Sequence, residues 1–126
     1  MPRRKLKVLL VDDEEAILDM LVLAFEEAGY DVATAANSTD AHTILEESGA
    51  ISLVVTDVSM PGSLDGIAFG QFVATTHPAM PLIIVSGVTR PDDRDLPAGA
   101  TFLAKPFKPS LLVEEAKLML AKAPQN

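Results

Sequence analysis

The chain has 126 residues, with 18 acidic against 10 basic side chains and a formal net charge of −8. A chain of this length forms one domain, and the absence of cysteine excludes disulfide frameworks, thiolate zinc sites, iron–sulfur clusters and cysteine nucleophiles. The acidic balance argues against direct binding of nucleic acid, and the longest apolar run, residues 20–25, is too short for membrane insertion. No secretory signal develops after the basic start, so we expect a single cytoplasmic domain over residues 1–126.

Short apolar runs alternate along the chain with stretches in which apolar residues recur at helical spacing. Ser38 is the expected N-cap of one helix, and Gly29 is expected to end another. Strands that alternate with helices predict an α/β fold, in which a five-stranded parallel sheet carries helices on both faces. In chain order, the pattern predicts a strand at 7–11, a helix at 14–28, a strand at 31–35, a helix at 38–47, a strand at 51–56, a helix at 66–76, strands at 81–85 and 100–104, and a helix at 110–122.

Polar side chains follow four of the five predicted strands, at the point where each strand ends. In an open parallel sheet, ligands bind outside the carboxyl ends of the strands, so we expect these side chains to converge on one edge. The converging residues are Asp12 and Asp13 after the first strand, Asp57 after the third, Ser86 and Gly87 after the fourth, and Lys105 and Pro106 after the fifth.

Three carboxylates, one hydroxyl and one ammonium group are together suited to phosphoryl transfer. Clustered carboxylates repel one another unless a hard cation such as Mg²⁺ lies among them, and an aspartate can attack phosphorus to form an aspartyl phosphate. A lysine and a serine hydroxyl can then bind the phosphoryl oxygens, while Gly87 leaves room for the group to enter. We infer a site that accepts phosphate on Asp57.

Each of these residues also has an ordinary structural explanation. The acids at 12–15 suit the positive end of a helix dipole, which is worth about 0.3–1 kcal/mol, and Asp57 suits a turn. The joint placement of all the polar residues after the strands of one sheet favours the phosphate site. His42 and His77 have no further ligand at metal-binding spacing, and we expect structural roles for both.

Four motifs resemble the receiver domain of two-component response regulators, and the resemblance extends over nearly the whole chain. They are Val-Leu-Leu-Val-Asp-Asp-Glu at 8–14, Val-Val-Thr-Asp-Val-Ser-Met-Pro-Gly at 54–62 with Asp-Gly at 65–66, Ile-Val-Ser-Gly at 84–87, and Phe-Leu-Ala-Lys-Pro-Phe at 102–107. The resemblance implies a CheY-like, flavodoxin-like strand order of 2-1-3-4-5. It also implies that the receiver fills the chain and leaves no room for an output domain.

The resemblance implies a metal site and a phosphoacceptor at the sheet edge. Asp57 would be the phosphoacceptor. Mg²⁺, or Mn²⁺ in its place, would be held by Asp13, Asp57 and the backbone carbonyl of Ser59. Asp12 would act on the metal through water.

The resemblance also implies a switch beside the phosphoacceptor. Lys105 would contact the phosphoryl group, and its bond to Pro106 would be cis. Ser86 would turn toward the phosphoryl group on activation, and Phe102 occupies the position of the family's aromatic switch.

The sequence departs from the common family pattern at three places. The loop between Pro61 and Asp65 is one residue longer. The short, proline-rich stretch at 87–99 predicts that the family's fourth helix is reduced or absent, and with it the usual partner-docking face. Ser59 and Val88 stand at positions that tune dephosphorylation, and neither carries a carboxylate or amide to orient water. We therefore expect a long-lived phosphoryl group.

The leading hypothesis is a phosphorylation-activated switch that receives its phosphoryl group from a histidine kinase or a histidine phosphotransfer protein. It would act on an unknown downstream protein, as a monomer or weak dimer, and would be no enzyme beyond its own phosphorylation and slow dephosphorylation. A receiver module of a hybrid histidine kinase, which serves as a phosphate sink, remains open. A haloacid-dehalogenase-type phosphatase fits less well, because the sequence at 57–59 lacks a second carboxylate. A flavin or nucleotide carrier is rejected, because acids occupy the place of its phosphate loop and would repel phosphate without a metal.

Overall fold

The computed structural model describes residues 6–48, 50–58, 66–86 and 99–122. Strands and helices alternate as the apolar pattern of the sequence predicts, close to the expected bounds. In chain order the elements are β1 (Lys7–Val11), α1 (Glu15–Glu27), β2 (Asp31–Ala35), α2 (Ser38–Ser48), β3 (Ile51–Asp57), α3 (Gly66–Thr76), β4 (Leu82–Ser86), β5 (Thr101–Ala104) and α4 (Pro109–Lys122).

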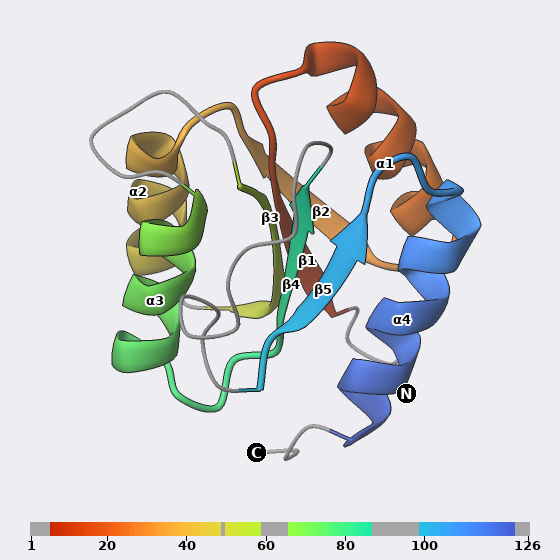
Figure 1. Ribbon diagram of the computed structural model, residues 1–126. Helices are drawn as coiled ribbons and strands as arrows, with labels where there is room; N and C mark the ends of the chain where they lie inside the picture. Colours follow the sequence, from red (N-terminus) through yellow and green to blue (C-terminus); the bar gives the residue numbers. More distant parts are fainter. Residues whose placement is uncertain (1–5, 49, 59–65, 87–98, 123–126) are drawn as a thin grey trace.

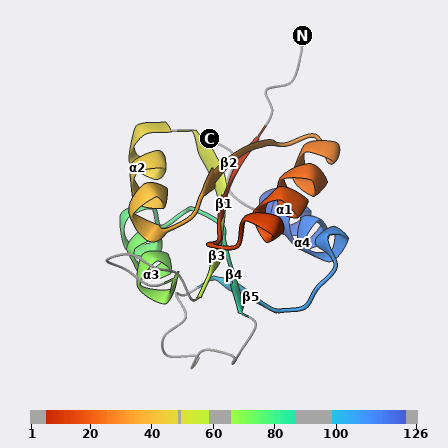
Figure 2. The same ribbon diagram turned by 90° about the horizontal axis from the view of Figure 1, so that it is seen from above.

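Five parallel strands form one sheet in the order β2-β1-β3-β4-β5. Helices α1 and α4 cover one face of the sheet and α2 and α3 the other, as the two views show (Figures 1 and 2). The predicted flavodoxin-like order and the helices on both faces are confirmed. Because all strands run parallel, their carboxyl ends share one edge, which lies at the top in Figure 1.

The central strands are buried on both faces. The four residues of β1 from Val8 to Val11 are at most 2% exposed, and β3 and β4 are buried almost throughout. Alternate residues belong to two apolar cores, because successive side chains of a strand point to opposite faces. Val8 and Leu10 pack with α1 and α4, whereas Leu9 and Val11 pack with α2 and α3. The sheet is therefore held from both sides, and its strand ends are fixed in place.

Of two predicted helix ends, the sequence identified one correctly and missed the other by one residue. Gly29 follows the end of α1 with a positive φ of 98°, as expected. The predicted cap of α2 is wrong by one residue, because the backbone N–H of Asp40 donates to the side-chain oxygen of Asn37 at 2.7 Å. Ser38 is the first residue of the helix and is buried. Asparagine and serine cap helices about equally well, so composition alone does not decide between neighbours.

Some sequence predictions concern residues that the structure does not describe. The segment for which a reduced family helix is predicted, residues 87–98, lies outside the described residues, and so does the longer loop after Pro61. Among the described helices, none is long and apolar enough to cross a membrane.

The core between the sheet and the α1–α4 pair contains Phe25, which is fully buried and packs edge-on against Tyr30 at a centroid distance of 5.8 Å. We expect Phe25→Ala to lower the free energy of unfolding by about 3–5 kcal/mol, because it leaves a cavity. Urea unfolding followed by circular dichroism measures this change. Leu23→Ala is the control, since Leu23 lies on the same helix and is 60% exposed. Its truncation should change the free energy by less than about 0.5 kcal/mol. Equal losses in both variants would contradict the assignment of the buried face.

Candidate functional site

Polar side chains from four strands meet at the carboxyl edge of the sheet. Asp57 is the last residue of β3, and Asp12 directly follows β1. The N–H of Asp12 donates to the carbonyl of Ala35 at the end of β2, at 3.1 Å. Lys105 directly follows β5, and its N–H donates to the carbonyl of Ser86 at the end of β4, at 2.7 Å. Backbone hydrogen bonds therefore extend to the site and fix where its side chains begin.

Three carboxylates form an acidic cluster at this edge. Asp12, Asp13 and Asp57 each offer an oxygen, and these oxygens all lie within 4.8 Å of one another. Asp12 and Asp57 are only 2% and 6% exposed, whereas Asp13 is open to solvent. Oxygen ligands of one Mg²⁺ lie roughly 3–4 Å apart, and Mg²⁺ prefers hard oxygen ligands of this kind. The residues present therefore fit a hard divalent cation that is reached from the solvent side.

Among the described residues, one ammonium group faces the acidic cluster. The Nζ of Lys105 donates to Oδ2 of Asp12 at 3.1 Å and lies 3.5 Å from Oδ1 of Asp57. The lysine side chain is 15% exposed, so these contacts are largely shielded from water. Lys105 offsets part of the negative charge and is placed to meet an oxygen of any group attached to Asp57.

Burial and the charges of neighbouring groups together shift the pKa values of Asp57 and Lys105. Burial raises the pKa of Asp57 above its ordinary value, the charge of Lys105 opposes that rise, and the charge of Asp12 adds to it. Burial alone would lower the pKa of Lys105, but its hydrogen bond to Asp12 and the charges of both acids outweigh burial and raise it. The lysine therefore stays protonated, and the ionised form of Asp57 depends on nearby positive charge.

The residues at the predicted switch positions lie on the last two strands. Ser86 ends β4 and is buried, and Phe102 of β5 is partly buried against the core on the α2–α3 face. The bond between Lys105 and Pro106 is cis, as the resemblance implies. Three further residues with predicted roles lie outside the described part of the chain: Ser59, Gly87 and Val88.

Glu14 is a member of the site that the sequence did not single out. Its Oε1 lies 4.0 Å from the Nζ of Lys105, and its backbone N–H donates to Oδ1 of Asp12 at 2.9 Å. In the sequence it is one of four consecutive acids at the start of a helix, and a helix dipole explains acids there equally well. The acidic run was a signal, but it does not say which side chain turns toward the lysine.

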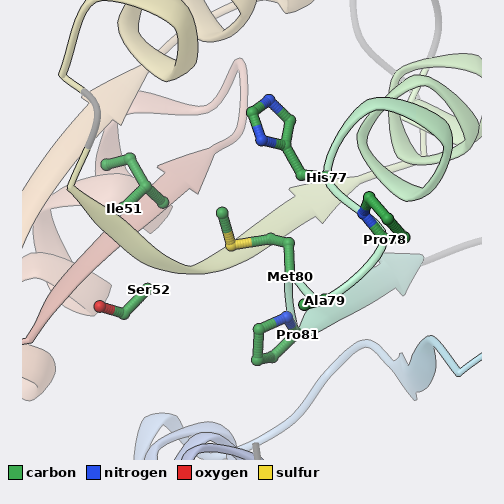
Figure 3. A pocket seen from close by; sticks show the side chains of 7 residues that line it. All are labelled: Ile51, Ser52, His77, Pro78, Ala79, Met80 and Pro81. Carbon is green, nitrogen blue, oxygen red and sulfur yellow. The ribbon is translucent and has the colours of Figure 1, made fainter. Parts of the chain in front are cut away.

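A pocket of about 350 Å³ lies at the opposite, amino end of the sheet (Figure 3). It opens between the start of β3 and the segment 77–81 that leads into β4, and apolar side chains such as Met80 form most of its lining. His77 lines this pocket, and its Nε2 lies 3.7 Å from the Glu46 carboxylate of α2. The ring of His42 packs on Phe72 of α3 at a centroid distance of 4.5 Å. Both histidines connect α2 with the α3 side.

Comparisons with known proteins agree with this geometry. A family model of the response regulator receiver domain matches residues 8–117. The chain is 34% identical over 120 residues to the response regulator receiver protein CpdR of Brucella abortus, which covers 93% of this chain and 98% of that protein. The chain is also 41% identical over 119 residues to the sensor kinase CckA of the same organism. This match covers 91% of the present chain but only 12% of the length of the kinase.

Solved structures have the same fold. A CheY-like receiver domain protein from Methanospirillum hungatei matches with a TM-score of 0.84 and 26% identity, over 94% of this chain and 96% of that one. A response regulator receiver protein from Sinorhizobium medicae matches with a TM-score of 0.88 and 25% identity, over 94% and 97% of the two chains. Sequence and fold thus agree over most of the chain, which belongs to the response regulator receiver domain family of two-component systems.

Proposed function

We propose that this chain is a phosphorylation-driven switch, in which Asp57 accepts a phosphoryl group from a histidine kinase or a histidine phosphotransfer protein in the presence of Mg²⁺. The observation that carries the proposal is the position of Asp57. This residue ends a buried strand, and its carboxylate lies beside those of Asp12 and Asp13. The Nζ of Lys105 lies 3.5 Å from it. Family membership supports the proposal, since receiver domains accept phosphate from histidine kinases.

Phosphoryl transfer needs a nucleophile, correct positioning and neutralised charge. A carboxylate oxygen of Asp57 attacks the donor phosphorus, the phosphorus–nitrogen bond of the phosphohistidine breaks, and its electron pair leaves with the imidazole. Lys105 offers its ammonium group to a phosphoryl oxygen. Asp13, Asp57 and the backbone carbonyl of Ser59 would hold Mg²⁺, with Asp12 acting through water. Bound Mg²⁺ would supply further charge neutralisation at the phosphoryl oxygens.

The phosphoryl group would be read out at the ends of β4 and β5. The carbonyl of Ser86 accepts a hydrogen bond from the N–H of Lys105. The residue whose hydroxyl would act as the switch is therefore hydrogen-bonded, through the backbone, to the lysine that would bind the phosphoryl group. Phe102 packs against the core beneath the same edge. A turn of the Ser86 hydroxyl toward the phosphoryl group would therefore disturb the β5 edge, and this altered surface would bind an unknown downstream protein.

Two biological settings are compatible with this chemistry. The match over nearly all of CpdR favours a free-standing switch, in which residues 1–126 act as one cytoplasmic domain, monomeric or weakly dimeric. The match to a small part of CckA supports the second candidate, a receiver module of a hybrid kinase that serves as a phosphate sink. In neither setting would the domain bind nucleic acid directly or insert into a membrane.

Incubation with acetyl phosphate or phosphoramidate and Mg²⁺ should add the mass of one phosphoryl group, because Asp57 is the nucleophile. Intact-mass spectrometry measures the adduct, which should be absent from Asp57→Ala. Asp31→Ala is the matched control, since Asp31 is an exposed aspartate at the amino end of β2. An unmodified parent chain, or an equal adduct on Asp57→Ala, would overturn the proposal.

Lys105→Met should lower the free energy of unfolding in the absence of divalent cations. We expect a loss of about 2–4 kcal/mol, because the buried Asp12 and Asp57 are left without their cation. The variant should also bind Mg²⁺ more tightly than the parent, since no ammonium group competes for the carboxylates. Chemical denaturation and isothermal titration calorimetry measure the two effects. Lys108→Met is the control, because Lys108 is exposed and forms no ion pair with this cluster. Equal stability of the two variants would contradict the role of Lys105.

The phosphorylated chain should keep its phosphoryl group for minutes or longer. Ser59 and Val88 provide no carboxylate or amide to orient an attacking water. After removal of the donor, the decay of the adduct can be followed by intact mass. Ser59→Asn should shorten the lifetime, because a side-chain amide can hold the water in place. A parent half-life of seconds would count against this expectation.

A further inference from the structure

The side chain of Glu14 does not cap the helix that it precedes. Glu14 is the N-cap residue of α1, with φ of −93° and ψ of 108°, yet its side chain makes no cap hydrogen bond. An N-cap side chain normally accepts a hydrogen bond from the first turn, and glutamate is not among the residues preferred there. The carboxylate instead lies 4.0 Å from the Nζ of Lys105. The lysine, rather than the helix, is therefore the partner of this side chain.

Glu14, Asp12 and Lys105 form a closed ring of contacts. The backbone N–H of Glu14 donates to Oδ1 of Asp12, and Oδ2 of Asp12 accepts from Lys105. The Glu14 carboxylate completes the ring at the ammonium group. Of the three acids in contact with that ammonium, Asp12 and Asp57 are buried, whereas the Glu14 side chain is 63% exposed. Glu14 is thus the acid that lies beside the ammonium group on the solvent side.

We propose that Glu14 is a positioning residue that selects phosphodonors by their charge. Glu14 acts through Lys105, because it shares the ammonium group of that lysine with Asp12 and Asp57. The negative charge of Glu14 also repels a small anion that approaches the ammonium group. The inference rests on the proposed function, since it requires Asp57 to be the phosphoacceptor. A dianionic donor should meet a larger barrier than a monoanionic donor of similar size.

Acetyl phosphate and phosphoramidate are such a pair of small donors. In both reactions an oxygen of Asp57 forms a bond to phosphorus. Acetyl phosphate, a dianion at neutral pH, releases acetate with the electron pair of the broken phosphorus–oxygen bond. Phosphoramidate, a monoanion whose nitrogen is already protonated, releases ammonia with the pair of the phosphorus–nitrogen bond. The acceptor and the transferred group are identical, so the two donors differ in charge and in leaving group.

The expected effect follows from Coulomb's law with ionic screening. A unit charge that acts on a dianion across roughly 6 Å of water at moderate salt changes a rate by about threefold. Glu14→Gln should therefore raise the rate constant with acetyl phosphate about threefold, and with phosphoramidate about 1.7-fold, because half the charge has half the logarithmic effect. At about 1 M salt, where the screening length is about 3 Å, both ratios should approach one.

The experiment follows the phosphoryl adduct of the full chain by intact mass at saturating Mg²⁺, with both donors and at low and high salt. Glu15→Gln is the matched control, since Glu15 is the adjacent exposed acid and has no ion pair with Lys105. A rate increase confined to Glu14→Gln, larger for acetyl phosphate and lost at high salt, supports the proposal. An unchanged rate, a change independent of salt, or an equal change in Glu15→Gln overturns it while Asp57 still takes up phosphate. If the parent chain takes up none, the proposed function fails and donor selection fails with it.

Discussion

One ammonium group set against a cluster of carboxylates determines what this site can accept. Lys105 lies within 3.1–4.0 Å of Asp12, Asp57 and Glu14, and Asp13 belongs to the same cluster. Four acids against one lysine leave the site negative, and the burial of two of them reduces screening by water. A phosphoryl group would add further negative charge. The negative charge of the site would therefore favour phosphate that arrives together with a divalent cation over phosphate alone.

The sheet beneath the site supplies the rigidity that such a cluster needs. Asp12 follows β1 and Asp57 ends β3, and these two neighbouring strands are buried on both faces. Lys105 follows β5, an edge strand that is only partly buried, and carries its charge on a long, flexible stem. Asp12 and Asp57, the latter the proposed nucleophile, thus stand on the most buried part of the sheet. Under the proposed function, the ammonium group that would exchange partners on phosphorylation follows the less buried edge strand.

The fold and most of the site could be predicted because burial leaves a clear pattern in the sequence. A short apolar run such as 51–56 predicts a buried strand, and a polar residue at its end, such as Asp57, then lies at the carboxyl edge. Local choices between equivalent residues could not be predicted in this way. Asn37 and Ser38 are both good caps, and only the backbone path shows which of them reaches a free N–H. Glu14 suits a helix start as well as a lysine contact, and only the folded chain distinguishes the two.

The backbone contact between β4 and β5 determines how a change at Asp57 would reach the surface. The N–H of Lys105 donates to the carbonyl of Ser86 at 2.7 Å, so the ends of β4 and β5 are hydrogen-bonded to each other beside Asp57. Both side chains bind phosphoryl oxygens under the proposed function, so phosphorylation would attract both strand ends at once. β4 is buried along its whole length and packs between two strands, whereas β5 lies at the edge and leaves Ala104 exposed. Local rearrangement requires the least free energy where the fewest contacts are lost. We therefore expect the β5 edge, rather than the central sheet, to carry the change to a partner.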